Sequence, residues 1–89
     1  MTKIVIADDE SNILTLLEIM LRDLDATIFS AENGEEAVKL ALKERPDLII
    51  SDIVMPKMNG FEVCRQIRKN KKHTVWLKQI KLLLISVIN

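Results

Sequence analysis

Several residue types are scarce or evenly balanced in this chain of 89 residues, and each of these features excludes a class of protein. Cys64 is the only cysteine, so an internal disulfide and a cysteine-based zinc site are both excluded, and we expect a reduced, cytoplasmic setting. Lysine plus arginine number 13, as do aspartate plus glutamate, which leaves no net charge. Because a free-standing nucleic-acid binder normally carries a basic surplus, we expect no nucleic-acid partner.

Long apolar runs are also missing. The longest runs, such as residues 82–85, are far too short to span a bilayer, so we expect no membrane segment. The chain reaches the acids Asp8 and Asp9 too soon for its start to be a secretory signal peptide. Hydrophobic residues still make up 48% of the chain, which is enough for the core of one domain. A domain this small buries only roughly 60 to 65% of its unfolded surface, so each element matters for stability.

The most informative stretch covers residues 47–60. An apolar run at 48–50 leads to Asp52, and Pro56 and Gly60 follow, which is the pattern of a buried strand that stops at a loop. Parallel α/β sheets place their chemistry where such strands end. Asp52 is therefore the first candidate functional residue.

Apolar runs of strand length alternate with segments of helical periodicity along the whole chain. The pattern predicts strands at about 4–7, 26–31, 47–52 and 82–85, and helices at about 11–23, 35–44 and 60–69. We expect Ser11 or Asn12 to cap the first helix, and Arg45-Pro46 to end the second. The expected apolar stripes are Ile13, Leu14, Leu17, Met20, Leu21 and Leu24 in the first helix, and Ala37, Val38, Ala41 and Leu42 in the second.

This alternation is typical of right-handed βαβ units on a parallel sheet. Ligands of such sheets gather beyond the carboxyl ends of the strands, where the winding direction reverses. If the first and third strands are neighbours there, Asp8, Asp9 and Asp52 converge on one site.

Three clustered carboxylates repel one another, and without a cation the pKa of at least one of them rises. Mg²⁺ relieves the repulsion, since it prefers carboxylate oxygens, waters and phosphate oxygens. No histidine or cysteine is near these acids in the sequence, so a zinc-type site is not expected. A carboxylate beside a bound Mg²⁺ and a phosphoryl donor can act as a nucleophile and form an aspartyl phosphate.

Together, these motifs resemble the receiver domain of two-component response regulators. They are Asp8-Asp9 after the first strand, Asp52 after the third, the loop Met55-Pro56-Lys57-Met58-Asn59-Gly60, and Ser86 at the end of the fourth strand. The resemblance implies a doubly wound, flavodoxin-like parallel sheet. It also implies a phosphoacceptor switch in a phosphorelay, and not an enzyme with independent turnover.

The resemblance assigns a role to each site residue. Asp52 would be the phosphoacceptor, taking the phosphoryl group from a sensor histidine kinase or phosphotransfer protein. Asp9 and Asp52 would ligate Mg²⁺ directly, with the backbone carbonyl of Val54 as a third protein ligand. Asp8 would act mainly through a bound water. The Ser86 hydroxyl would hydrogen-bond the phosphoryl oxygen.

The end of the chain departs from the family pattern. We expect residues 1–89 to form one incomplete receiver domain that lacks the last helix, strand and helix, with an atypical connecting segment at 70–80. The lysine that the family carries at the end of the missing strand then has no counterpart. The strand at 82–85 would be an apolar sheet edge, so we expect marginal stability and self-association through it. Trp76 is a candidate to fold over the gap.

Two alternatives to the phosphoacceptor function remain open in the sequence. One is a truncated interaction module, impaired in phosphotransfer, that binds a kinase or another receiver. The other is a Mg²⁺-dependent phosphohydrolase that forms an aspartyl phosphate. Such an enzyme requires a second acid two residues after the nucleophile, and Val54 at that position counts against it. Lys57 in the loop is a further cation near the site, or a solvated side chain.

Overall fold

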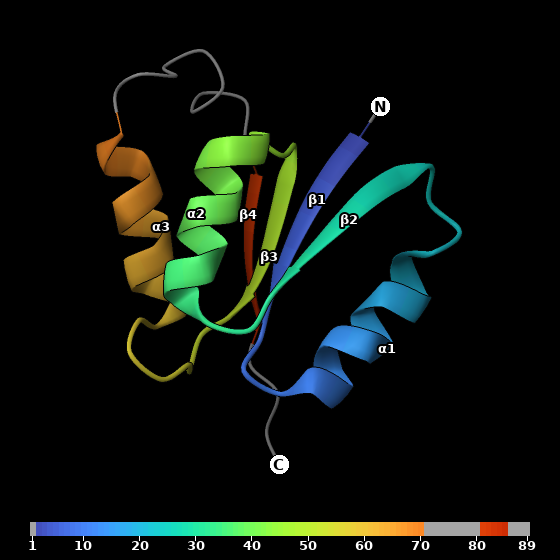
Figure 1. The fold of residues 1–89 in the computed structure, drawn as a ribbon, viewed down its shortest axis with the longest axis horizontal. Helices are drawn as coiled ribbons and strands as arrows, with labels where there is room; N and C mark the ends of the chain where they lie inside the picture. Colours follow the sequence, from blue (N-terminus) through green and yellow to red (C-terminus); the bar gives the residue numbers. More distant parts are fainter. Residues whose placement is uncertain (1, 71–80, 86–89) are drawn as a thin grey trace.

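Four parallel strands form the centre of the protein, with helices on both faces. The computed structural model describes residues 2–70 and 81–85. The strands β1 (Thr2–Ala7), β2 (Ala26–Ala31), β3 (Leu48–Asp52) and β4 (Lys81–Ile85) lie in the order β2-β1-β3-β4. Helices α2 (Gly34–Glu44) and α3 (Gly60–Lys69) pack side by side on one face, and α1 (Ser11–Leu21) covers the other (Figure 1). The predicted doubly wound, flavodoxin-like core is confirmed.

Alternating side chains of the strands build two apolar clusters, one on each face of the sheet. Val5 and Ala7 of β1 face α2 and α3, whereas Ile4 and Ile6 face α1. Small residues allow the helices to approach the first of these faces closely, since Ala37 and Ala41 of α2 are buried there. Strands buried on both faces read as continuous apolar runs, which is why they are easily recognised in the sequence.

The register of the sheet aligns the strand ends that carry the acids. Ala7 of β1 is paired with Ser51 of β3. Asp8, the residue after Ala7, and Asp52, the residue after Ser51, therefore lie at the same edge of the sheet. The amide of Asp8 donates to the carbonyl of Ala31 over 3.1 Å. The predicted adjacency of the first and third strands is therefore present, and it places the acids together.

One predicted helix end is confirmed and one predicted cap is wrong, and the structure shows two further caps that the sequence did not predict. Asn33 and Asn59 cap α2 and α3 by accepting a side-chain hydrogen bond from a backbone amide of the first turn. Arg45 adopts a left-handed conformation with φ 48° and ends α2 before Pro46, as predicted. The expected capping of α1 by Ser11 or Asn12 is wrong, because the helix already starts at Ser11 and Glu10 is the cap residue.

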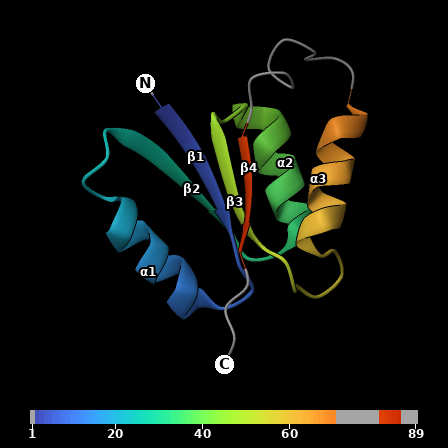
Figure 2. The ribbon, with the colours of Figure 1, turned by 180° about the vertical axis from the view of Figure 1, so that it is seen from behind.

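The predicted apolar stripe of α1 is also only partly correct. Leu14 is buried, and Leu17 and Leu21 pack partly against the cluster on that face. Met20 is 66% exposed, and Leu24, which lies beyond the end of α1 at Leu21, is exposed as well. Seen from behind, α1 lies beside the β1 and β2 side of the sheet (Figure 2). Helical periodicity shows which residues share a face of the helix, but it does not show how much of the sheet that face covers.

Some predictions fall outside the described residues. They concern Ser86, Trp76 and, apart from Asn70, the connecting segment at 70–80. Among the described helices, none combines the length and apolar character that crossing a membrane requires.

Candidate functional site

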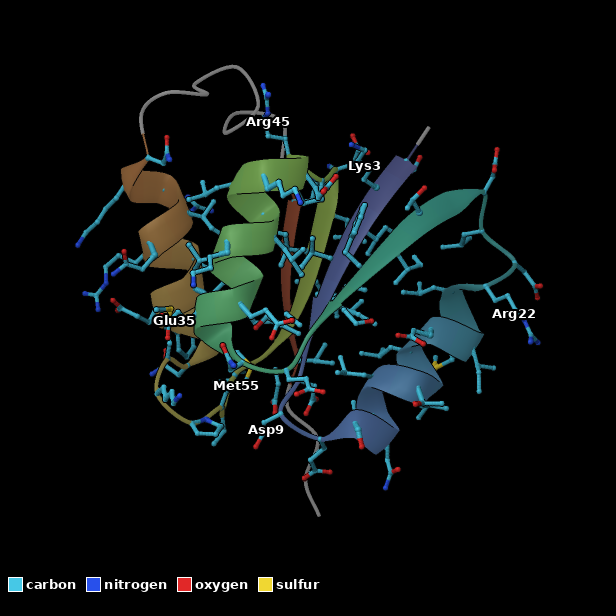
Figure 3. All side chains as sticks on the ribbon, viewed as in Figure 1. Lys3, Asp9, Arg22, Glu35, Arg45 and Met55 are labelled. Carbon is cyan, nitrogen blue, oxygen red and sulfur yellow. The ribbon has the colours of Figure 1, made fainter. Side chains whose placement is uncertain are left out.

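Three carboxylates meet at the carboxyl edge of the sheet. Asp8 and Asp9 follow β1, Asp52 ends β3, and one oxygen from each lies within 4.8 Å of the others. Figure 3 shows Asp9 at this edge, with Met55 of the following loop on the same side of the molecule. The convergence predicted from the sequence is confirmed, and it gathers three formal negative charges in one place.

Asp8 is the buried member of this cluster, with 1% of its surface exposed. Its Oδ1 accepts a hydrogen bond of 2.9 Å from the amide of Glu10. Its Oδ2 is buried and has no hydrogen-bond partner among the described residues. Burial is the main cause that raises the pKa of Asp8 above its ordinary value; the Glu10 amide opposes this, and the charges of Asp52, Asp9 and Glu10 add to it.

A buried acceptor without a hydrogen-bond partner destabilises the fold, because the group loses its hydrogen bonds to water and forms none within the protein. A hard cation, or a water bound to one, would satisfy Asp8 Oδ2 and offset the repulsion among the three carboxylates. The donor set consists of carboxylate oxygens only, which suits Mg²⁺. The residues present therefore fit this ion.

Asp52 lies where rigid strand gives way to loop. Its side chain is partly exposed, while Ser51 before it is buried and donates its hydroxyl to the Asp52 carbonyl over 3.0 Å. On the other side, the amide of Ile53 donates to the Ile85 carbonyl over 2.9 Å. Hydrogen bonds on both sides thus hold the backbone around Asp52 in place, while its side chain remains partly exposed.

The loop after Asp52 folds back on itself. The amide of Gly60 donates to the carbonyl of Ile53 over 2.8 Å, and Met55 is buried in the core between these ends. Val54 stands in this loop, two residues past Asp52, with an exposed side chain. Lys57 is exposed and has a positive φ of 70°.

One residue near the site was not identified from the sequence. Gly34 was not among the residues singled out from the sequence, yet in the fold it abuts Met58 of the loop after β3. A Cβ at Gly34 would lie 2.5 Å from the Met58 carbonyl oxygen. The two residues are 24 positions apart in the chain (58 − 34), so only the packing of α2 against the loop reveals the contact.

Comparisons with known proteins agree with this geometry. The family model described as "Response regulator receiver domain" matches residues 4–86. The alkaline phosphatase synthesis transcriptional regulatory protein PhoP of Bacillus subtilis (strain 168) is 46% identical over 69 residues, covering 78% of this chain and 29% of PhoP. The chain thus spans less than a third of the length of this curated relative.

Solved structures match the fold closely. A chain in the crystal structure of histidine kinase ThkA in complex with response regulator protein TrrA is 40% identical with a TM-score of 0.81, and the match covers all of this chain and 72% of that one. The receiver domain of sensor histidine kinase PA1611 from Pseudomonas aeruginosa PAO1, which has a magnesium ion coordinated in its active site cleft, is 25% identical with a TM-score of 0.81. That match covers 93% of this chain and 65% of the PA1611 chain. With the family match over residues 4–86 and an acidic cluster like the magnesium site of such domains, this chain belongs to the receiver domain family of two-component response regulators.

Proposed function

We propose that this chain is a phosphoacceptor in a two-component phosphorelay and accepts a phosphoryl group on Asp52 from a histidine kinase or phosphotransfer protein. The observation that carries the proposal is the acidic cluster itself: Asp52 is accessible at the end of β3, beside two further acids, one with a buried oxygen that has no partner in the described part of the chain. The kinase complex of TrrA, a similar protein, supports the class of partner. We place this relay in the cytoplasm.

Asp9, Asp52 and the backbone carbonyl of Val54 would hold Mg²⁺, and Asp8 would contribute through a bound water. When bound, the ion neutralises negative charge on the oxygens of the transferring phosphoryl group. The magnesium ion in the PA1611 receiver structure supports this choice of metal.

The chain's own part in the transfer is nucleophilic. A carboxylate oxygen of Asp52 forms a bond to phosphorus while the bond between phosphorus and the donor imidazole nitrogen breaks. The imidazole keeps the electron pair of that bond and takes a proton from solvent. The Ser86 hydroxyl would donate a hydrogen bond to a phosphoryl oxygen. The acceptor is consumed in the reaction, so this chemistry is a switch rather than independent turnover of a substrate.

Acetyl phosphate with Mg²⁺ provides a direct test, read by intact-protein mass spectrometry. The wild-type chain is expected to gain one phosphoryl group, and Asp52→Asn to gain none. Asp47→Asn is the matched control, since Asp47 is an acid just before the opposite end of β3, and it should be phosphorylated like the wild type. Absence of phosphorylation in the wild type, together with kinase binding that Asp52→Asn leaves unchanged, would instead support the impaired interaction module.

A second proposal concerns self-association through β4. This strand is last in the sheet order, and within residues 2–70 and 81–85 no strand pairs with its outer edge. Leu83 on it is 50% exposed, so the edge offers both backbone hydrogen-bonding groups and apolar surface to a second copy.

Sedimentation velocity of the wild type and two variants tests this self-association. Leu83→Lys should shift the protein toward monomer. Leu16→Lys, at a residue of α1 with an almost equal exposure of 51%, should not. A concentration-independent monomer for the wild type would refute the proposal.

A further inference from the structure

The start of α2 lies unusually close to the loop that follows Asp52. A Cβ added at Gly34 would be 2.5 Å from the backbone oxygen of Met58, 2.8 Å from the Met58 Cβ and 3.0 Å from Cγ2 of Val63. Real Cβ atoms essentially never approach heavy atoms within 3.0 Å. The nearest of these neighbours is a backbone atom, which no side-chain rotation can move away. Any side chain at Gly34 must therefore displace the backbone at Met58 or the start of α2.

Space alone explains why glycine stands at this position. Neither glycine of the protein has a positive φ, so an alanine at Gly34 would meet no backbone strain. Gly34 is the first residue of α2, directly after the cap residue Asn33, and nothing in its backbone conformation calls for glycine there. The close contact with Met58 therefore accounts for glycine at this position.

Hydrogen bonds tie the loop that contains Met58 and Val54 at several points. The Met58 amide donates to the Pro56 carbonyl over 2.7 Å, and the next residue, Asn59, caps α3 by accepting from the Glu62 amide over 2.8 Å. The loop is closed at its base by the bond between Gly60 and Ile53. Val54 and Met58 therefore lie within the same closed loop, between Ile53 and Gly60.

We infer that Gly34 is a positioning residue for the metal site: its missing side chain lets the loop 53–59 pack against α2 and so holds the Val54 carbonyl where it can ligate Mg²⁺. This inference rests on the proposed function, since it requires the Mg²⁺ site formed by Asp9, Asp52 and Val54. It adds to that site a residue from a different element, which contacts neither the ion nor the phosphoryl group.

Gly34→Ala tests the inference when its Mg²⁺ affinity is measured by isothermal titration calorimetry. We expect the affinity to fall roughly tenfold or more, as it does when residues that orient metal ligands are changed. Ala41→Gly is the matched control: it lies in the same helix, is fully buried and destabilises α2, but it is not among the residues that crowd the loop. The Mg²⁺ affinity of Ala41→Gly should equal that of the wild type. If Gly34 only stabilised α2, both variants would lose Mg²⁺ affinity.

A measurement on the wild type covers the case in which Gly34→Ala does not fold. Titration with Mg²⁺ should move the amide NMR resonances of Gly34 and Met58 and leave that of Ala41 in place. Equal affinities of Gly34→Ala and wild type, or an unmoved Gly34 resonance, would overturn the positioning role and leave the proposed function intact. If the wild type binds no Mg²⁺, both the metal site and the inference fail.

Discussion

Replacing Asp8 with asparagine should stabilise the metal-free protein at neutral pH. Asp8 is buried, its Oδ2 has no partner within the described residues, and its pKa is raised mainly by burial. An asparagine can still accept the Glu10 amide through its carbonyl oxygen. Its NH₂ group can donate to the neighbouring carboxylates, whereas a charged Asp8 can only repel them.

The size of the effect follows from the geometry. Two unit charges 4.8 Å apart, the largest separation between the chosen oxygens, repel by about 0.9 kcal/mol at the dielectric constant of water and by about 3.5 kcal/mol at an effective value of 20. Asp9 is exposed and Asp52 partly so, which favours the lower half of this range. We expect a gain of about 1 to 2 kcal/mol, or about 4 to 16 °C in Tm for a domain of this size.

The difference between the two proteins should depend on pH in a defined direction. The pKa of Asp8 is higher in the folded than in the unfolded protein, so the native state binds more protons between the two values. Wild-type stability therefore falls relative to Asp8→Asn as the pH rises from about 3.8, the ordinary value, through the raised pKa. Above the raised pKa the full difference is present, and below 3.8 it disappears.

Urea unfolding followed by circular dichroism, with EDTA present, measures this difference from pH 3.5 to pH 7.5. Asp9→Asn is the control, because it removes a charge from the same cluster at an exposed position and should give a smaller gain. With Mg²⁺ at 100 times its dissociation constant, the wild type should gain about 2.7 kcal/mol, and the advantage of Asp8→Asn should shrink. If Asp8→Asn is less stable than the wild type in EDTA at pH 7, the conclusion that the charge of Asp8 destabilises the metal-free protein is refuted.

Three further measurements test the fold around the site. Asn33→Ala removes the cap of α2 and should cost about 1 kcal/mol in urea unfolding, whereas Asn33→Asp should be nearly neutral; equal losses would contradict the capping role. Ile67→Ala should cost about 2 to 5 kcal/mol, because Ile67 is fully buried in the cluster between α3 and the sheet; a loss below 1 kcal/mol would show that this cluster is loosely packed. Alkylation of Cys64 by iodoacetamide at pH 8 should be slower in the native protein than in urea, because burial raises the pKa of its thiol, and equal rates would contradict that burial.

The elements of the fold could be predicted from the sequence because their signals are local. Strands buried on both faces, such as β1 and β3, contain continuous apolar runs. The bounds of β2 match its prediction, 26–31, although most of its residues are only partly buried. The starts of α2 and α3 were predicted within one residue, and in the structure Asn33 and Asn59 cap these helices. The start of α1 has no such side-chain cap, and there the predicted capping residue was wrong.

The packing of α1 could not be predicted in the same way. Its predicted apolar stripe repeats at helical spacing, but Met20 of that stripe is exposed. Periodicity shows that a helix has an apolar face, whereas burial depends on the area of sheet that lies opposite. In the described structure α1 contacts β1 and β2, and this area covers only Leu14 fully.

Some features of the acidic site were likewise predictable from the sequence, and others were visible only in the tertiary structure. The sequence by itself determined which acids end which strands, because a strand end is marked locally by a change from apolar to charged residues. Only the tertiary structure decided that β1 and β3 are neighbours, that Asp8 is buried with an oxygen lacking a partner in the described part of the chain, and that Gly34 meets Met58. These facts depend on contacts between residues far apart in the chain, and such contacts are set by the packing of the whole sheet and its helices rather than by local propensity.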